Sequence, residues 1–164
     1  MKKTIVVYGT SMGISEGIAN DIAIKLGCKA LNVQELSKEV VNEFDNLILG
    51  TSTWGHGEAQ DDWFNGLKIL KSSDLSNKTI AIFGSGDSVV YADRFCSGMA
   101  DLYNVVKAGG ANIIGSVSTD DYHFEDSKAV IDGKFVGLAL DNENEESKTP
   151  SRIASWLESI SSSL

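Results

Sequence analysis

The chain has 164 residues, of which 42% are hydrophobic, and 23 acidic against 14 basic side chains give it a formal net charge of −9. This length and composition fit one compact domain with a sizeable core, so a single domain over residues 1–164 is expected. The negative charge argues against nucleic-acid binding, because a phosphate backbone would be repelled, whereas a basic protein partner would be attracted.

Apolar segments predict the strands of a parallel sheet. They show no polar alternation, which is typical of strands that are buried on both faces. In chain order they cover residues 4–8, 30–33 (the weakest), 47–50, 79–83 and 113–117. A stretch rich in Asp and Tyr, residues 118–134, interrupts the last of them, and residues 135–139 then resume the strand pattern.

Helical periodicity separates most of these strands. The predicted helices cover residues 15–26, residues 93–108, and a final segment that opens at Thr149-Pro150. The first places Ile18, Ile22 and Leu26 on one face and stops before Gly27. Alternating strands and helices predict an α/β fold: a doubly wound, five-stranded parallel sheet with helices on both faces and an insertion in the last strand.

Three loops each follow a predicted strand and precede a predicted helix. The first loop covers residues 8–16, the second residues 50–63 and the third residues 84–93. Ligands bind beyond the carboxyl ends of such strands, so the three loops are expected to converge at one edge of the sheet.

The first loop suits an anion. Thr10, Ser11 and Ser15 offer hydroxyl donors beside the amides of a helix N-terminus. The loop has no lysine or arginine, unlike the Gly-Lys-Ser/Thr arrangement of nucleotide hydrolases, which disfavours kinase or NTPase chemistry. Simple capping of the helix by Ser11 or Ser15 is the alternative interpretation.

The second and third loops each carry an aromatic residue beside glycines. Trp54 is followed by Gly55, so an indole and backbone amides can approach one planar ligand, although a turn with a packing tryptophan is the alternative. The third loop offers Gly86, the carboxylate of Asp87 and the ring of Tyr91. Together with the anion loop, this pair of rings favours a planar, phosphorylated redox cofactor.

Catalytic and export signals do not emerge from the sequence. It has no Gly-x-Ser-x-Gly or His-Glu-x-x-His motif, so triad hydrolysis and a histidine-rich metal site are disfavoured.

The first apolar run ends at Tyr8-Gly9, too short for a secretory signal, and no stretch is long enough to cross a membrane. Cys28 and Cys96 lack Cys-x-x-Cys spacing, so reduced thiols in a cytoplasmic protein are expected.

The three loops, in this order, resemble the motifs of the flavodoxin family. Thr10-Ser11-Met12-Gly13-Ile14-Ser15 resembles its Thr-x-Thr-Gly-x-Thr phosphate motif, and Thr53-Trp54-Gly55 resembles its Thr-Trp-Gly loop. Gly86-Asp87 with Tyr91-Ala92-Asp93 resembles its Gly-Asp…Tyr-x-Asp loop. Residues 119–141 are similar to the insertion of the long-chain subgroup.

The resemblance implies a flavodoxin-like fold and a low-potential one-electron carrier with non-covalently bound FMN, not an enzyme, with no catalytic residue and no metal ligand. It assigns to the cofactor Thr10, Ser11, Met12, Gly13, Ile14, Ser15, Thr53, Trp54, Gly55, His56, Gly57, Ser85, Gly86, Asp87, Tyr91, Asp93 and Asp141. The expected partners are basic-faced redox proteins, such as a flavodoxin/ferredoxin reductase and electron-accepting enzymes. Neither nucleic acid nor a membrane is expected to bind, and the chain is expected to be a monomer.

Charges in the loops bear on the potential of such a carrier. Carboxylates beside the cofactor disfavour added negative charge and are expected to lower the second reduction potential, whereas Arg94 offsets part of their field. The acidic residues concerned are Glu58, Asp61, Asp62, Asp87 and Asp93. His56 either makes the potential pH-dependent or is a solvated loop side chain.

Two other functions stay open. A flavin-dependent quinone or NAD(P)H reductase of the same fold would oxidise NAD(P)H by itself, although nothing in the chain resembles a nicotinamide site. A binding module such as a signalling receiver would need an acidic pair at the end of the first strand, where Val7-Tyr8-Gly9 stands instead.

Overall fold

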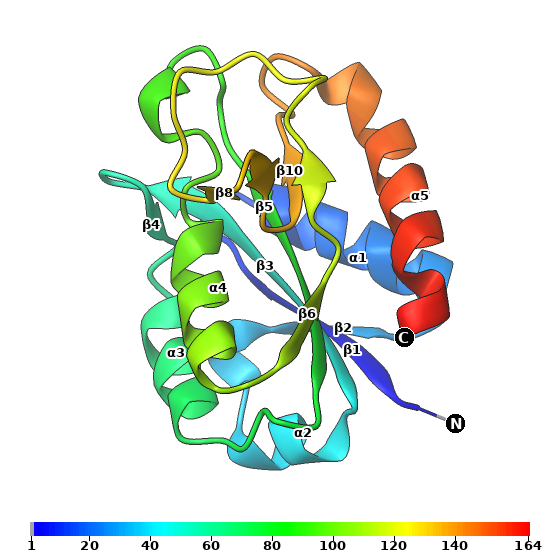
Figure 1. The fold of residues 1–164 in the computed structure, drawn as a ribbon. Coiled ribbons are helices and arrows are strands. Elements are labelled where there is room, and N and C mark those ends of the chain that lie inside the picture. Colours follow the sequence, from blue (N-terminus) through cyan, green and yellow to red (C-terminus); the bar gives the residue numbers. More distant parts are fainter. Residues whose placement is uncertain (1) are drawn as a thin grey trace.

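The computed structural model describes residues 2–164 and has a parallel sheet between two layers of helices (Figure 1). The main strands lie in the order β10-β5-β3-β1-β2. Their bounds are β1 Thr4–Gly9, β2 Lys29–Asn32, β3 Asn46–Trp54, β5 Thr79–Ser85 and β10 Leu138–Leu140; β6 (Asn112–Ile114) also pairs with β5, and the short β4 (Glu58–Ala59) pairs antiparallel with β3. The predicted doubly wound α/β fold is confirmed.

Helices cover both faces of the sheet (Figure 1). On one face lie α1 (Ile14–Leu26) and α5 (Thr149–Ile160), and on the other α3 (Trp63–Lys71) and α4 (Met99–Ala108). The short helix α2 (Lys38–Glu43) joins the core of the second face through Val41. Within residues 2–164, none of the helices is both long enough and apolar enough to span a membrane.

Strand residues alternate between two buried cores, one on each face of the sheet. In β1, Ile5 and Val7 pack in the core with α3 and α4, whereas Val6 and Tyr8 pack in the core with α1 and α5. The central strands β3 and β5 alternate in the same way. Burial on both faces explains why each of these strands is a continuous apolar run in the sequence.

The parallel register brings three strand ends to one level. Tyr8 of β1 lies beside Gly50 of β3, and Gly50 lies beside Phe83 of β5. The chain therefore leaves all three strands at the same edge of the sheet, and the three loops emerge side by side there.

Two short strands, β6 and β10, pair one after the other along the same strand, β5. β6 pairs with the start of β5 and β10 with its end, so an insertion interrupts the strand as predicted. Inside the insertion, β7 (Val117–Ser118), β9 (Lys134–Phe135) and β8 (Val130–Ile131) form a small antiparallel sheet. The predicted bounds were wrong: the strand leaves the sheet after Ile114, before Gly115 with its φ of 88°, and Phe135 belongs to β9.

One helical prediction differs from the structure, and one short helix was missed. The helix expected from residue 93 begins at Met99, because Ala92–Arg94 form a separate 3-10 turn and Cys96 has a left-handed φ of 54°. Helix α2 was not predicted, since its six residues are too few to show a helical period.

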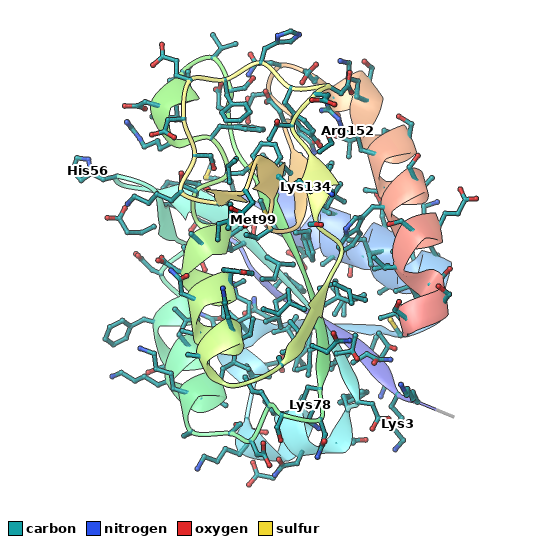
Figure 2. All side chains as sticks on the ribbon, viewed as in Figure 1. Lys3, His56, Lys78, Met99, Lys134 and Arg152 are labelled. Atoms are coloured by element: carbon teal, nitrogen blue, oxygen red, sulfur yellow. The ribbon has the colours of Figure 1, made fainter. Side chains whose placement is uncertain are left out.

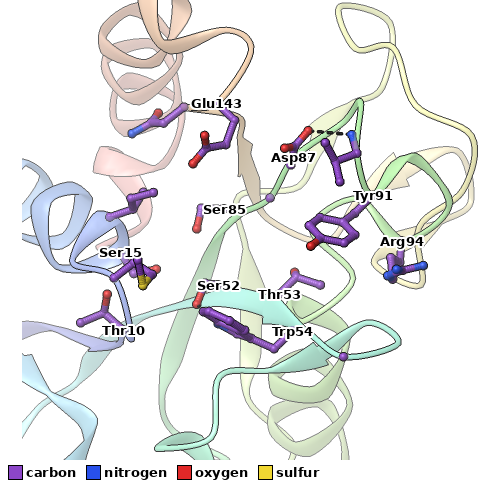
Figure 3. Close-up of a pocket in the computed structure, with 16 residues that line it drawn as sticks. Thr10, Ser15, Ser52, Thr53, Trp54, Ser85, Asp87, Tyr91, Arg94 and Glu143 are labelled. Atoms are coloured by element: carbon purple, nitrogen blue, oxygen red, sulfur yellow. Dashed lines mark hydrogen bonds between the residues drawn. The ribbon is translucent and has the colours of Figure 1, made fainter.

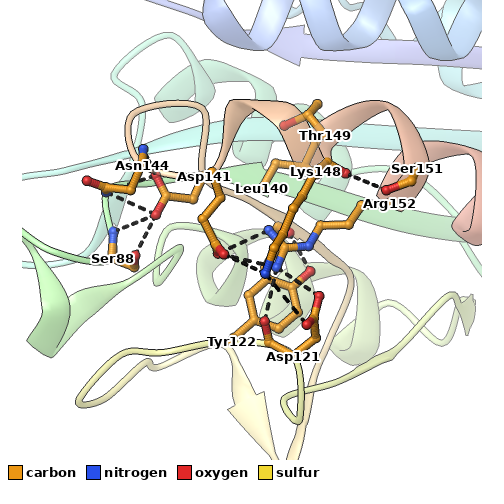
Figure 4. Close-up of polar contacts among 12 residues, drawn as sticks. Ser88, Asp121, Tyr122, Leu140, Asp141, Asn144, Lys148, Thr149, Ser151 and Arg152 are labelled. Atoms are coloured by element: carbon orange, nitrogen blue, oxygen red, sulfur yellow. Dashed lines mark hydrogen bonds and ion pairs between the residues drawn. The ribbon is translucent and has the colours of Figure 1, made fainter.

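Arg152 joins the insertion to α5 (Figure 4). Its Nη2 lies 3.2 Å from Asp121 Oδ2 and 3.3 Å from Glu145 Oε1, and its guanidinium lies 4.1 Å from the centroid of the Tyr122 ring. Lys148 Nζ approaches Glu145 Oε2 at 2.8 Å. The hydrogen bond from Lys148, with Arg152 close by, lowers the pKa of Glu145, and the hydrogen bond from Arg152 lowers the pKa of Asp121.

Two glycine substitutions should change stability in opposite directions. A Cβ at Gly137 would overlap the carbonyl oxygen of Ile82, so Gly137→Ala should lower the free energy of unfolding by about 3 kcal/mol or more. A Cβ at Gly17 meets open space on α1, so Gly17→Ala should raise it by about 0.5–1 kcal/mol. Urea unfolding measures the free energy of unfolding of each variant. Equal effects of the two substitutions would contradict this packing of β10 on β5.

The Arg152 cluster should stabilise the fold except in acid. Arg152→Met should lower the free energy of unfolding by about 1–3 kcal/mol at pH 7, because it removes the partner of Glu145. Carboxylates with lowered pKa values contribute fully above about pH 5 and lose the contribution as pH falls through their folded values. The difference from the parent should therefore shrink between about pH 5 and pH 3 in urea unfolding.

Lys148→Met is the matched control for that variant. Lys148 makes more exposed contacts with the same two carboxylates, so its loss should cost less than the loss of Arg152. A difference between Arg152→Met and the parent that stays constant over this pH range would contradict the role of the ion pairs.

Candidate functional site

The three loops enclose a cavity of about 560 Å³ at the carboxyl edge of the sheet (Figure 3). A volume of this order is typical of cofactor and small-ligand sites. The lining residues are Thr10, Met12, Ile14, Ser15, Ser52, Thr53, Trp54, Gly55, Ser85, Gly86, Asp87, Val90, Tyr91, Arg94, Asn142 and Glu143.

One end of the cavity lies at the start of α1. Gly13 precedes the helix in a left-handed conformation, with φ 87°, and its N–H donates to Thr10 Oγ1 at 2.9 Å. Ser15 is 1% exposed, and its Oγ has no hydrogen-bond partner within residues 2–164. A buried hydroxyl without a partner costs about 1–3 kcal/mol, and the first amides of a helix lack intrahelical acceptors. This end therefore suits an anion that accepts hydrogen bonds from both.

The other end of the cavity is aromatic. Figure 3 shows Trp54 and Tyr91 there, away from Thr10 and Ser15. Trp54 is 43% exposed and Tyr91 48%, so both rings have free surface toward a ligand. Trp54 Nε1 donates to Ser52 Oγ at 2.7 Å, which holds the indole in place. Such rings can pack on a planar ligand.

Gln60 ties the second loop to the first. Its side chain is buried, and its Nε2 donates to Ser11 Oγ at 3.0 Å and to the carbonyl oxygen of Thr10 at 3.3 Å. Its own N–H donates to Thr51 Oγ1 at 2.9 Å. The Ser11 hydroxyl thus contacts Gln60, and Ser11 is not among the residues that line the cavity.

Asp141 ties the third loop to the end of β10 (Figure 4). Its carboxylate is fully buried and accepts hydrogen bonds from the N–H and hydroxyl of Ser88 and from the N–H and Nδ2 of Asn144. Asn144 Nδ2 also donates to Asp87 Oδ1 at 2.8 Å. This network holds the third loop against residues 141–144, two of which line the cavity.

Two carboxylates and one guanidinium give the lining its charge. Partial burial alone would raise the pKa of Asp87, but the hydrogen bonds from the amides of Val90 and Val89 and from Asn144 together lower it. Asp87 is therefore ionised at neutral pH. Glu143 adds a second carboxylate, and Arg94 is the one basic residue of the lining within residues 2–164.

Several predicted site residues do not line the cavity. His56 lies at the outer tip of the β3–β4 hairpin (Figure 2) and is not in the lining, and its backbone N–H donates to Glu58 Oε2 at 2.6 Å. Gly57 packs near Ser97, and Asp93 pairs with Arg94 at 2.8 Å. Those outside the lining are Ser11, Gly13, His56, Gly57, Asp93 and Asp141; those that line it are Thr10, Met12, Ile14, Ser15, Thr53, Trp54, Gly55, Ser85, Gly86, Asp87 and Tyr91.

Five lining residues were not among the predicted site residues: Ser52, Val90, Arg94, Asn142 and Glu143. Asn142 and Glu143 belong to an acidic run that reads as a solvated loop. Only the position of β10 beside β5 brings this run to the cavity. Ser52 directly precedes the predicted residue Thr53, and Val90 directly precedes the predicted residue Tyr91. That proximity was the only signal for these two residues in the sequence.

Comparisons with known proteins find one family. The family model described as Flavodoxin matches residues 6–156. "Flavodoxin" of Helicobacter pylori is 40% identical over 164 residues, covering 99% of both chains, and "Flavodoxin 1" of Azotobacter vinelandii is 40% identical, covering 96% of this chain and 94% of that protein. The crystal structure of Fusobacterium nucleatum flavodoxin bound to flavin mononucleotide matches with a TM-score of 0.93 at 37% identity, covering 100% of this chain and 99% of the other.

Asp141→Asn should loosen the third loop. An amide cannot accept from all four donors and presents its own N–H groups to them, so the free energy of unfolding should fall by about 1–3 kcal/mol. Amide hydrogen exchange at Ser88 and Asn144 should become faster. Asp74→Asn is the control, because Asp74 accepts similarly from Ser76 on an exposed turn. Unchanged exchange at Ser88 would contradict the role of Asp141.

Proposed function

Because the chain belongs to the flavodoxin family, we propose that it is a low-potential one-electron carrier that holds FMN non-covalently in this cavity and passes electrons between redox protein partners. One observation carries the proposal: the cavity combines a buried, unpartnered hydroxyl at Ser15 with half-exposed rings at its other end. FMN has matching parts, a phosphate and a planar ring system. When bound, it supplies acceptance and release of single electrons.

The first loop fits the phosphate group. The hydroxyls of Thr10 and Ser15 and the backbone amides of Ser11, Met12, Ile14 and Ser15 form its donor set, while Gly13 N–H donates to Thr10 Oγ1 and shapes the loop. The loop has no lysine or arginine, so neutral donors hold the charge. Met12 and Ile14 also line the cavity with apolar surface.

The second and third loops fit the ring system. Trp54 and Tyr91 offer flat surfaces, and Thr53, Gly55, Ser85, Gly86 and Asp87 line the cavity between or beside them. Gly55 is left-handed, with φ 57°, and a Cβ there would lie 2.6 Å from Glu58 Oε2, so the turn before His56 and Gly57 favours glycine. Asp93 and Asp141 act indirectly, Asp93 through Arg94 and Asp141 through Ser88.

The residues of the cavity suit electron transfer better than substrate turnover. The lining within residues 2–164 contains no histidine, the side chain that serves most often as a general acid or base at neutral pH, and the hydrogen bonds that Asp87 accepts keep that carboxylate ionised. Ionised Asp87 and nearby Glu143 disfavour added negative charge and so keep the potential low. These residues bind and orient the cofactor and determine the electrostatic field that acts on it.

The rim of the cavity is a surface for a redox partner. Met12 and Val90 are 78% and 67% exposed, and the chain as a whole carries a net charge of −9. An apolar rim on an acidic protein fits a partner with a basic face around an apolar centre, such as a flavodoxin/ferredoxin reductase or an electron-accepting enzyme.

Further features belong to the same proposal. The strand position shared by β6 and β10 supports membership of the long-chain subgroup. The match of the family model to residues 6–156 supports one FMN-binding domain over residues 1–164. The scarcity and wide spacing of cysteines support a cytoplasmic protein, and the high net charge supports a monomer.

An anaerobic reductive titration of the FMN-loaded protein tests the proposal. A carrier should bind FMN tightly and take up two electrons in two well-separated steps in the visible spectrum. An added assay of NAD(P)H oxidation tests the other candidate, a reductase of the same fold. Turnover of NAD(P)H by the chain alone, or uptake of both electrons in one step, would contradict the carrier.

Ser15→Ala should separate cofactor binding from folding. The apoprotein should be as stable as the parent or slightly more stable, because the lost hydroxyl has no partner. FMN affinity should fall about tenfold or more, as expected for a lost hydrogen bond to a charged group. Ser11→Ala is the control, because the Ser11 hydroxyl contacts Gln60. The FMN affinity of this variant should change by less than about threefold. Fluorescence titration with FMN measures the affinity of each variant. Equal losses of FMN affinity in the two variants would contradict the role of the buried Ser15 hydroxyl.

A further inference from the structure

We propose that Arg94 sets the potential of the second one-electron reduction, because its guanidinium is held on Tyr91 at the cavity wall and partly offsets the field of Asp87 and Glu143. The inference rests on the proposed function and adds one specific residue to it. A carrier whose cavity held only carboxylates would have a lower second potential than this chain.

The position of Arg94 is well defined. Its guanidinium carbon lies 5.0 Å from the centroid of the Tyr91 ring, and its side chain is 29% exposed. Nη1 approaches Asp93 Oδ1 at 2.8 Å. Arg94 lines the cavity whereas Asp93 does not, so the positive member of this ion pair is the one at the cavity.

Backbone contacts fix the turn that carries Arg94. Its N–H donates to the carbonyl oxygen of Tyr91 at 3.1 Å, which keeps the two residues together. The carbonyl oxygen of Ala92 accepts from the amides of Glu125 at 2.8 Å and Asp126 at 3.0 Å, both in the insertion. With the turn fixed, the ion pair to Asp93 and the contact with the Tyr91 ring hold the guanidinium more firmly than that of a solvated surface cation.

A cation in this place should act mainly on the second electron. An electron from a low-potential reductant such as dithionite that enters without a proton would add one negative charge within the cavity. A guanidinium in the cavity wall stabilises that added charge, and Asp87 and Glu143 oppose it. Arg94 therefore favours the fully reduced form over the forms that precede it.

The experiment compares Arg94→Gln with the parent, both loaded with FMN, by spectroelectrochemistry at pH 8. The variant should bind fully reduced FMN about two- to fivefold more weakly, relative to the preceding redox state, because a partly exposed charge is removed. For a one-electron step this corresponds to a second potential about 20–40 mV more negative. Raising the salt concentration should reduce the difference.

Three further variants separate charge from packing. Arg94→Lys keeps the charge and should restore most of the parent potential. Asp93→Asn frees the guanidinium from its counterion and should shift the second potential the opposite way, to less negative values. Lys68→Gln is the matched control. Lys68 Nζ lies 4.3 Å from the centroid of the Phe64 ring, and neither residue lines the cavity. This variant removes an equal charge and should leave the second potential unchanged.

The outcomes distinguish this inference from the proposed function. If the parent binds no FMN, the proposed function itself fails. If FMN binds and Arg94→Gln has the parent potential, the role of Arg94 is wrong while the carrier stands. A variant that weakens binding of every redox state equally would show that Arg94 only positions Tyr91, and would also overturn the inference.

Discussion

The parallel register of β1, β3 and β5 is the constraint on which the site depends. Tyr8, Gly50 and Phe83 lie side by side across these strands, so three loops leave the sheet at one level. A shift of one residue in any strand would exchange its two faces and bury the wrong side chains. Gly50 is part of this constraint, because a Cβ there would overlap the ring of Phe83, and its carbonyl oxygen accepts from Trp63 Nε1 at 2.9 Å.

Contacts between distant segments then turn three separate loops into one cavity wall. Gln60 joins the first two loops, and Asp141 joins the third to the end of β10. Thr53 Oγ1 accepts from the N–H of Gly98 at 3.0 Å, which ties the second loop to the start of α4. Each contact uses a buried or half-buried polar group whose loss would leave a donor or acceptor unpaired. The cavity can thus keep its shape without a ligand.

The sequence predicted what local patterns determine. The strands β1, β3 and β5 are buried on both faces and read as apolar runs, and the glycine and aromatic residues of the loops are unusual enough to indicate a site. The start of α4 was wrong because the left-handed Cys96 interrupts a continuous helical period. Asn142, Glu143 and Gln60 were missed because their roles arise from contacts that a sequence does not display.

Charge and hydrogen bonding have separate roles in this cavity. A lysine at the phosphate end would increase affinity through its charge, but a cavity of about 560 Å³ has dimensions comparable to the Debye length of about 8 Å, so its field would also reach the ring end. Neutral donors such as the hydroxyls of Thr10 and Ser15 can bind an anion without adding a net positive charge to the cavity. On the proposed function, geometry at the start of α1 sets the affinity, while the charges of Asp87, Glu143 and Arg94 in the lining act on the potential. That separation would let an acidic protein hold an anionic cofactor and still disfavour its further reduction.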